Sequence, residues 1–544
     1  YEGIGGFTEL YKNRIVVPFE GNYEDFRHVV HHELTHAVLN DYLYGGSVQS
    51  LVSGQVKIDL PLWLSEGYAE YSSRDWDSNT DMIIRDAIIN DLIPPIQYLS
   101  NYMAYKGGQS VLRHIGETYG IKKIADLMGN VKHSPSFNKA LQKTIGKNLE
   151  KFGEEWKFSL RKAYWPEIED RQILNEVGRK LTDHVELKNY FNTSPAISPN
   201  GGKVAFLSDR NGYADIFLLK MNDTEPAIKI LSGQKTAALE EMKWLSPGID
   251  WSPDNEEIVF AAKAGSEDAL TFYNTATKKQ RQVKLGLDGI STARWSPDNE
   301  KIVFAGLNNG ATDIYIYTIK DGSLMQMTND YFSDADPSWS PDSKKVVFVS
   351  DRQEHLNMDN IDTTSDSYMV NHHYRNTDIY VLNVATKEIE RITTTEQDES
   401  SPIFFNTSNA LAYTSDRNGI WNIYRHDLNE GISVPLTDVL AGVFQLSICK
   451  DDSRLIFSGY EKGGWDIYSL NNPLEIPSYD ALRLSTYLTR DDLQFSLDYT
   501  DSLNNPEIGT HNQYENYVFG QRNIKIDQAN KPLPGDGVLS DEIT

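Results

Sequence analysis

A repeated segment in the second half of the chain restricts the available folds more than any other feature. Three copies carry the letters WSPD, and their prolines, Pro253, Pro297 and Pro341, follow one another at intervals of 44 residues. Each copy reads as a strand, a turn, an apolar strand, a second turn and a strand of DIY type. Asn-Gly in several second turns supplies the positive φ that tight hairpins need. Short strands repeated with this period predict the blades of a β-propeller.

Six copies align between residues 178 and 473, and most of them end in a fourth, outer strand. The fifth and sixth copies have lost WSPD, which we interpret as drift of the repeat. After the sixth copy no fourth strand is evident, whereas residues 180–184 before the first copy have the pattern of one. We therefore expect Leu181 and its neighbours to complete the sixth blade and remove the open sheet edges.

The repeat letters WSPD, IVFAG, SDRNG and TDIY resemble the TolB-type propeller. This resemblance covers residues 178–473 and implies an all-β, six-bladed domain. It implies little about chemistry, because propellers of this type mostly bind partners or shield a site.

Residues 1–172 follow a helical pattern instead. Apolar residues recur at three- and four-residue spacing in segments such as 24–43 and 149–165, after a single expected strand at 13–19. We thus expect a multidomain chain: a mainly helical α+β domain over 1–172 and the propeller over 178–473. Residues 474–544 are expected to be a linker followed by loop- and β-rich chain, or the start of a further domain.

The segment HHELTHAV contains two histidines, His32 and His36, that are four positions apart. On a helix such residues share one face, so both imidazoles can reach one ion. Glu33 points aside from the two ligands and can reach a water at the metal, which is the arrangement of an H-E-x-x-H motif. His31 falls on a different face and is expected to be a bystander.

A second motif, WLSEGYAEYSS, follows about thirty residues later and predicts a short helix that begins near Pro61. It places Glu66 and Glu70 four positions apart, among apolar residues that would bury one face. A carboxylate on a buried face needs a partner or a metal.

Together the two motifs resemble the gluzincin metallopeptidases, a group that includes thermolysin and the aminopeptidase N type. The helical tail after them is similar to peptidase MA-like domains, so the resemblance extends over most of residues 1–172. It implies one zinc ion (Zn2+) held by His32, His36 and Glu66, with Glu33 as the general base.

The same resemblance implies roles for two further residues. Glu70 corresponds to the carboxylate that orients a ligand histidine, with a surface glutamate as the alternative. Tyr105, in the segment YKGG, corresponds to the tyrosine that stabilises the oxyanion, with a buried core tyrosine as the alternative. The aminopeptidase motif Gly-Ala-Met-Glu-Asn is not found, and this favours an endopeptidase or oligopeptidase over an aminopeptidase.

The charge and composition of the chain limit the classes of partner that it can bind. Asp and Glu number 78 against 52 Lys and Arg, which disfavours nucleic acid and anionic lipid as main partners. We expect a peptide or protein substrate, and an envelope protein as partner of the propeller. No apolar run reaches the roughly 18 residues of a membrane helix, so we expect membrane association only through a C-terminal region beyond this sequence. The TolB resemblance favours an extracytoplasmic bacterial setting, in the periplasm or at the cell surface.

A rival hypothesis from another class makes the chain a non-catalytic scaffold of the cell envelope, which uses the propeller to bind proteins. Metal content separates the two hypotheses, because an inert helical domain has no need of a bound zinc ion. A serine peptidase is disfavoured, since no G-x-S-x-G motif follows the propeller.

Overall fold

The computed structural model describes residues 5–8, 14–19, 21–44, 60–223, 225–243, 248–356, 372 and 374–489. All of them belong to one compact unit. The β- and loop-rich chain expected after residue 489 lies outside the described residues. Within them, no helix is both long enough and apolar enough to cross a membrane.

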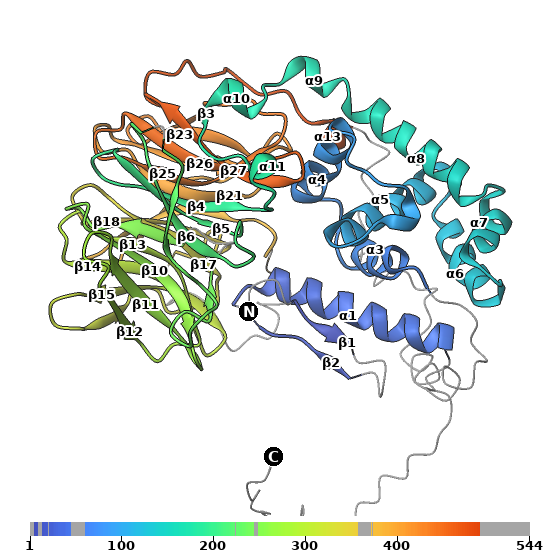
Figure 1. Cartoon of the computed structure of the whole chain (residues 1–544), viewed down its shortest axis with the longest axis horizontal. Coiled ribbons are helices and arrows are strands. Elements are labelled where there is room, and N and C mark those ends of the chain that lie inside the picture. Colours follow the sequence, from blue (N-terminus) through green and yellow to red (C-terminus); the bar gives the residue numbers. More distant parts are fainter. Residues whose placement is uncertain are drawn as a thin grey trace, which may run out of the picture. The chain divides into compact units, whose positions relative to one another are not determined.

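The N-terminal region is helical with a small antiparallel hairpin, in which Phe7 pairs with Val16 and Thr8 with Ile15. Figure 1 shows this hairpin beside the first helix. The core contains the fully buried side chains of Trp63, Phe152 and Trp156. The elements are β1 (Phe7–Thr8), β2 (Ile15–Val16), α1 (Tyr23–Tyr44), α3 (Leu62–Ser73), α4 (Ser78–Ile89), η1 (Ile96–Tyr98), α5 (Tyr102–Tyr119), α6 (Lys122–His133), α7 (Phe137–Ile145), α8 (Leu149–Tyr164), α9 (Glu167–Asp170) and α10 (Leu174–Val177).

Helices α3 and α5 touch through their backbones, because a glycine of each faces the other. A Cβ at Gly67 would lie 2.4 Å from the carbonyl carbon of Gly108, and a Cβ at Gly108 would lie 2.2 Å from the oxygen of Trp63. Real Cβ atoms do not approach backbone so closely, so both positions require glycine. The crossing brings the first turns of α5 beside the residues that follow Trp63 on α3.

Six antiparallel sheets form the propeller, one for each sequence repeat, and confirm the predicted number of blades (Figure 1). Tryptophans of the WSPD turns join neighbouring blades: Trp251 Nε1 donates to Ala196 O at 2.9 Å, and Trp339 Nε1 to Arg294 O at 3.2 Å. The first three blades contain β4 (Asn192–Ile197), β5 (Lys203–Ser208), β6 (Asp215–Lys220) and β7 (Ile228–Leu231); β8 (Glu241–Met242), β9 (Ile249–Trp251), β10 (Glu257–Ala264), β11 (Glu267–Asn274) and β12 (Gln280–Lys284); β13 (Gly289–Trp295), β14 (Lys301–Asn308), β15 (Ala311–Thr318) and β16 (Leu324–Gln326).

The last three blades have the same strand order, and the sixth takes its outer strand from the chain that precedes the first blade. Their elements are β17 (Asp334–Trp339), β18 (Lys345–Ser350), β19 (Asp378–Asn383) and β20 (Ile389–Arg391); β21 (Glu399–Phe404), β22 (Ala410–Ser415), β23 (Asn422–Asp427) and β24 (Ile432–Pro435); β25 (Gly442–Ile448), β26 (Arg454–Glu461), β27 (Gly464–Asn471) and β3 (Arg179–Lys180).

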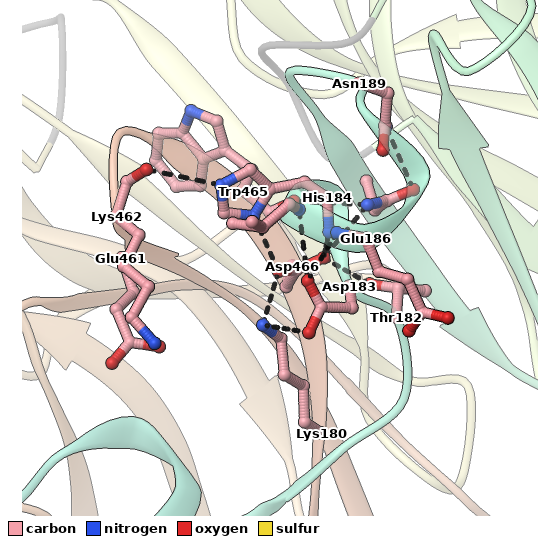
Figure 2. A network of polar contacts seen from close by, with 12 residues as sticks. Lys180, Thr182, Asp183, His184, Glu186, Asn189, Glu461, Lys462, Trp465 and Asp466 are labelled. Atoms are coloured by element: carbon pink, nitrogen blue, oxygen red, sulfur yellow. Dashed lines mark hydrogen bonds and ion pairs between the residues drawn. The ribbon is translucent and has the colours of Figure 1, made fainter.

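The ring closes through β3 and a single buried carboxylate. β3 pairs with β27 over only two residues, and Leu181 N donates to Ile467 O at 2.8 Å. Asp466, on β27, contacts several residues of the segment 180–184, which begins in β3 (Figure 2). Its carboxylate accepts hydrogen bonds from Thr182 Oγ1 at 2.8 Å and His184 N at 2.9 Å, and pairs with Lys180 Nζ at 3.0 Å. The carboxylate thus contacts three residues of the segment 180–184, whereas the ladder pairs only two residues with β27.

His184 begins the short helix α11 (His184–Leu187), and we expect it to make the ring closure sensitive to pH. Its Nδ1 lies 2.7 Å from Asp466 Oδ2. Burial lowers the pKa of His184, but the Asp466 carboxylate outweighs burial and raises it above the ordinary value. The imidazolium thus stabilises the folded ring fully below about pH 6.5, and this stabilisation is lost as pH rises through the raised pKa.

We expect hydrogen exchange at the amides of β3 and Leu181, corrected for its intrinsic pH dependence, to show less protection at about pH 8 than at about pH 6. His184→Gln should remove most of this difference, because glutamine does not titrate. An undiminished pH dependence in His184→Gln would assign it to another group.

The helical region and the propeller share a polar contact centred on α4. Arg85 is fully buried and ion-paired with Asp81, and its guanidinium donates to Leu440 O at 2.8 Å and Ala441 O at 3.2 Å. Asp86 accepts hydrogen bonds from the backbone N–H groups of Lys462 and Gly463, each at 2.7 Å. After the sixth blade, α13 (Thr486–Thr489) returns to α9, where Thr486 N donates to Glu167 Oε1 at 2.7 Å.

Candidate metal centre

A cavity of about 770 Å³ lies among α1, α3, α5 and β1. All of the residues singled out in the sequence for chemistry line it. They are His32, Glu33, His36, Glu66, Glu70 and Tyr105.

Three of these residues bring their ligand atoms together. His32 Nε2 lies 3.1 Å from His36 Nε2 and 3.3 Å from Glu66 Oε2, and His36 Nε2 lies 3.1 Å from the same oxygen. Two atoms bound to a tetrahedral zinc ion at about 2.1 Å lie roughly 3.4 Å apart. The triangle formed by the three atoms therefore fits one face of a zinc coordination tetrahedron.

Each of the two histidines has an oxygen near its other ring nitrogen, although His32 Nδ1 makes no hydrogen bond of good geometry. His32 Nδ1 lies 3.3 Å from Glu70 Oε1, and His36 Nδ1 lies 3.3 Å from Ser65 Oγ. Such partners fix the orientation and tautomer of an imidazole so that Nε2 is presented to a metal. Glu70 is 5% exposed and is therefore not a surface glutamate, while its role in orienting His32 stays a prediction.

Glu70 is buried and is held by two groups besides His32. Lys106 Nζ lies 2.7 Å from its Oε2, and His28 Nε2 lies 3.4 Å from its Oε1. Burial raises the pKa of Glu70, but hydrogen bonds from His28 and His32 and the charge of Lys106 outweigh burial and lower it well below its usual range. The carboxylate therefore stays ionised at neutral pH.

The imidazoles and carboxylates of this donor set shift one another's pKa values. Burial lowers the pKa of His32, yet the carboxylates of Glu66 and Glu70 raise it to about 9. Burial raises the pKa of Glu66, yet His32 and His36 lower it to about 2. The two carboxylates thus favour the protonated form of His32.

Among the described residues, Glu33 belongs to none of the groups whose ligand atoms cluster, and it is 6% exposed. Its Oε2 accepts a hydrogen bond of 2.7 Å from Thr8 Oγ1, on β1. Tyr105 lines the same cavity, with its ring stacked on that of His32 at a centroid distance of 5.9 Å. Burial and the Glu66 carboxylate raise the pKa of Tyr105 to about 12, so its phenol remains a hydrogen-bond donor at neutral pH.

Several residues of this centre were not found by sequence reasoning: Thr8, Ser65, His28 and Lys106. Lys106 and Ser65 are each adjacent to a residue already singled out, and His28 lies four residues before His32 on the same helix, whereas Thr8 carried no local signal. His31 belongs to none of the metal-capable groups among the described residues. Another such group, Asp313, Asp330 and Asp334 in the propeller, already has a cation, because Arg352 pairs with Asp330 and Asp334.

Comparisons with known proteins concern the propeller. A family model described as the TolB beta propeller domain matches residues 231–369. Together with the six sheets, this match supports a TolB-like propeller. No curated protein matches the chain.

Solved structures with a similar fold include two described as TolB. The one from Agrobacterium tumefaciens has 17% identity and a TM-score of 0.40, over 52% of this chain and 90% of that one. The one from Acinetobacter baumannii has 16% identity and a TM-score of 0.35, over 53% and 66%. The β-propeller domain of the Trilobed protease from Pyrococcus furiosus has 14% identity and a TM-score of 0.34, over 54% and 85%.

Proposed function

We propose that the chain is a zinc-dependent peptidase of gluzincin type that cleaves peptide bonds within a peptide or protein chain. The observation that carries the proposal is the convergence of His32 Nε2, His36 Nε2 and Glu66 Oε2 on one point, with distances of 3.1 to 3.3 Å between them. A carboxylate that is not part of this set, Glu33, borders the same cavity.

His32, His36 and Glu66 would hold the zinc ion. When bound, zinc acts as a Lewis acid that polarises a carbonyl and makes a water acidic near neutral pH. Glu70 and Ser65 keep the two imidazoles in the orientation that this requires, through the contacts at Nδ1.

Glu33 accepts a proton from the attacking water and later returns it to the leaving amine, which is the work of a general base and acid. The phenol of Tyr105 donates a hydrogen bond to the oxyanion that forms on the scissile carbonyl. Since the raised pKa keeps this phenol protonated, it needs no change of charge during the reaction.

The propeller is assigned a binding or gating role for substrates or partners. Support comes from its contact with α4, the helix that follows the Glu66-bearing α3, through Arg85 and Asp86. An extracytoplasmic setting is part of this proposal, in keeping with the TolB-like propeller.

Zinc titration of three proteins tests the metal site. We expect wild type to bind one zinc ion per chain, and His36→Gln to weaken zinc binding more than about 100-fold, because it removes a ligand and not merely a supporting contact. His31→Gln is the matched control, with the same substitution on the same helix at a residue outside the donor set, and should bind as wild type does. Equal zinc affinity in His36→Gln and wild type would contradict the proposed ligands.

A further inference from the structure

The hairpin strand β1 lies against α1 at the level of Glu33, and a glycine permits this approach. A Cβ at Gly6 would lie 3.1 Å from Glu33 Cγ and 2.9 Å from Val29 Cγ1. Both distances are shorter than ordinary carbon contacts, so a larger residue at position 6 would force these side chains or the strand to shift. The glutamate side chain thus occupies the space that a side chain at position 6 would fill.

Thr8, in β1, lies two residues after Gly6, so in extended chain its side chain points to the same side. Its Oγ1 lies 2.7 Å from Glu33 Oε2 and 2.9 Å from Glu33 O. The hydroxyl has one proton and therefore shares it between the carboxylate and the backbone carbonyl of the same residue. This contact ties the end of the Glu33 side chain to a fixed point on the hairpin.

We propose that Thr8 is a positioning residue for the general base, and this inference rests on the proposed peptidase function. By holding Oε2, Thr8 selects one rotamer of Glu33 and leaves the other carboxylate oxygen for proton transfer. A hydrogen bond to an ionised carboxylate is among the stronger kinds and gains strength when the carboxylate is buried. Gly6 leaves room for the Glu33 side chain, and Thr8 orients its carboxylate.

A purely structural role for Thr8 is the alternative, in which the hydroxyl only fastens β1 to the backbone of α1. Removal of the hydroxyl without a change of shape separates the two roles. A fastening role predicts loss of stability, whereas a positioning role predicts loss of turnover with the fold and the metal site intact.

Thr8→Val, which keeps the shape of threonine, tests the inference in the zinc-loaded full chain. We expect kcat to fall about 10- to 100-fold, the scale of a misplaced catalytic group, with KM, zinc content and thermal midpoint close to those of wild type. Thr8→Ser retains a hydroxyl and should restore most of the kcat. An unchanged kcat in Thr8→Val, or a loss of kcat that Thr8→Ser does not rescue, would overturn the proposal, as would a loss of zinc.

Thr35→Val is the matched control, because Thr35 lies on α1 and donates to His31 O at 2.8 Å, away from Glu33. It should have wild-type kcat. A crystal structure of Thr8→Val gives a readout that is independent of activity: the Glu33 carboxylate should leave the position it has beside β1, and an unmoved carboxylate would refute positioning. If wild type itself cleaves no peptide, the proposed function fails, while this crystallographic comparison still tests the contact.

Discussion

Glu33→Gln is expected to retain one zinc ion per chain and to lower kcat for peptide hydrolysis about 10²- to 10⁴-fold, the usual contribution of a general acid–base residue. Glutamine has the shape of glutamate and can still accept the hydrogen bond from Thr8, but it cannot take up a proton near neutral pH. Glu33 lies outside the set formed by His32, His36 and Glu66, so its replacement leaves the ligand atoms in place. Single-turnover kinetics and metal analysis on the same preparation measure both quantities.

Asp41→Asn supplies the matched control for this variant. It replaces an exposed carboxylate by an amide on the same helix, α1, and should cleave peptides at the wild-type rate. Turnover by Glu33→Gln within about threefold of wild type would exclude Glu33 as the base, since an essential proton acceptor contributes far more.

Asp466→Ala is expected to destabilise the closed propeller by about 3 to 5 kcal/mol, the cost of removing one partner from a buried ion pair. The carboxylate is 2% exposed and accepts hydrogen bonds from Thr182 and from the backbone N–H of His184, besides its contact with Lys180. The change would leave these donors without their acceptor in a buried place. Urea unfolding, with hydrogen exchange at the amides of β3 and β27, would locate the loss at the ring closure.

Asp321→Ala is the control for ring closure, because Asp321 lies in an exposed turn of the third blade and binds only its neighbour Ser323 among the described contacts. We expect its stability to remain within about 0.5 kcal/mol of wild type. If Asp466→Ala were no less stable than Asp321→Ala, the Asp466 carboxylate would not be what holds β3 in the sixth blade.

The local spacing of residues sufficed to predict part of the candidate centre. His32 and His36 share a face of α1 because they are four residues apart, and the second motif placed Glu66 on a helix of its own. Thr8 could not be found in this way. Its contact with Glu33 spans 25 residues and arises only when β1 packs against α1, a tertiary contact without a local sequence signal.

In the propeller, too, the sequence pattern predicted some elements and missed others. The repeated segments predicted six blades, which the sheets confirm. The outer strand of the second blade, β12, was not predicted, because its sequence is largely charged and polar.

The only cysteine is explained by the repeat. Cys449 Sγ contacts Asp451 Oδ1 at 3.0 Å and accepts from Arg454 N at 3.2 Å, as the turn serine Ser252 does with Asp254 and Glu257. The sixth copy, which lacks WSPD, thus forms the same turn with Cys449 in the place of the serine.

Cleavage of a mixed peptide library, followed by mass spectrometry, tests the central claim most directly. The account predicts that zinc-loaded wild type cleaves internal peptide bonds, that a chelator stops the cleavage, and that added zinc restores it. Wild type that binds one zinc ion at His32, His36 and Glu66 and yet cleaves no peptide in the library would contradict the peptidase assignment and favour a scaffold role for the chain.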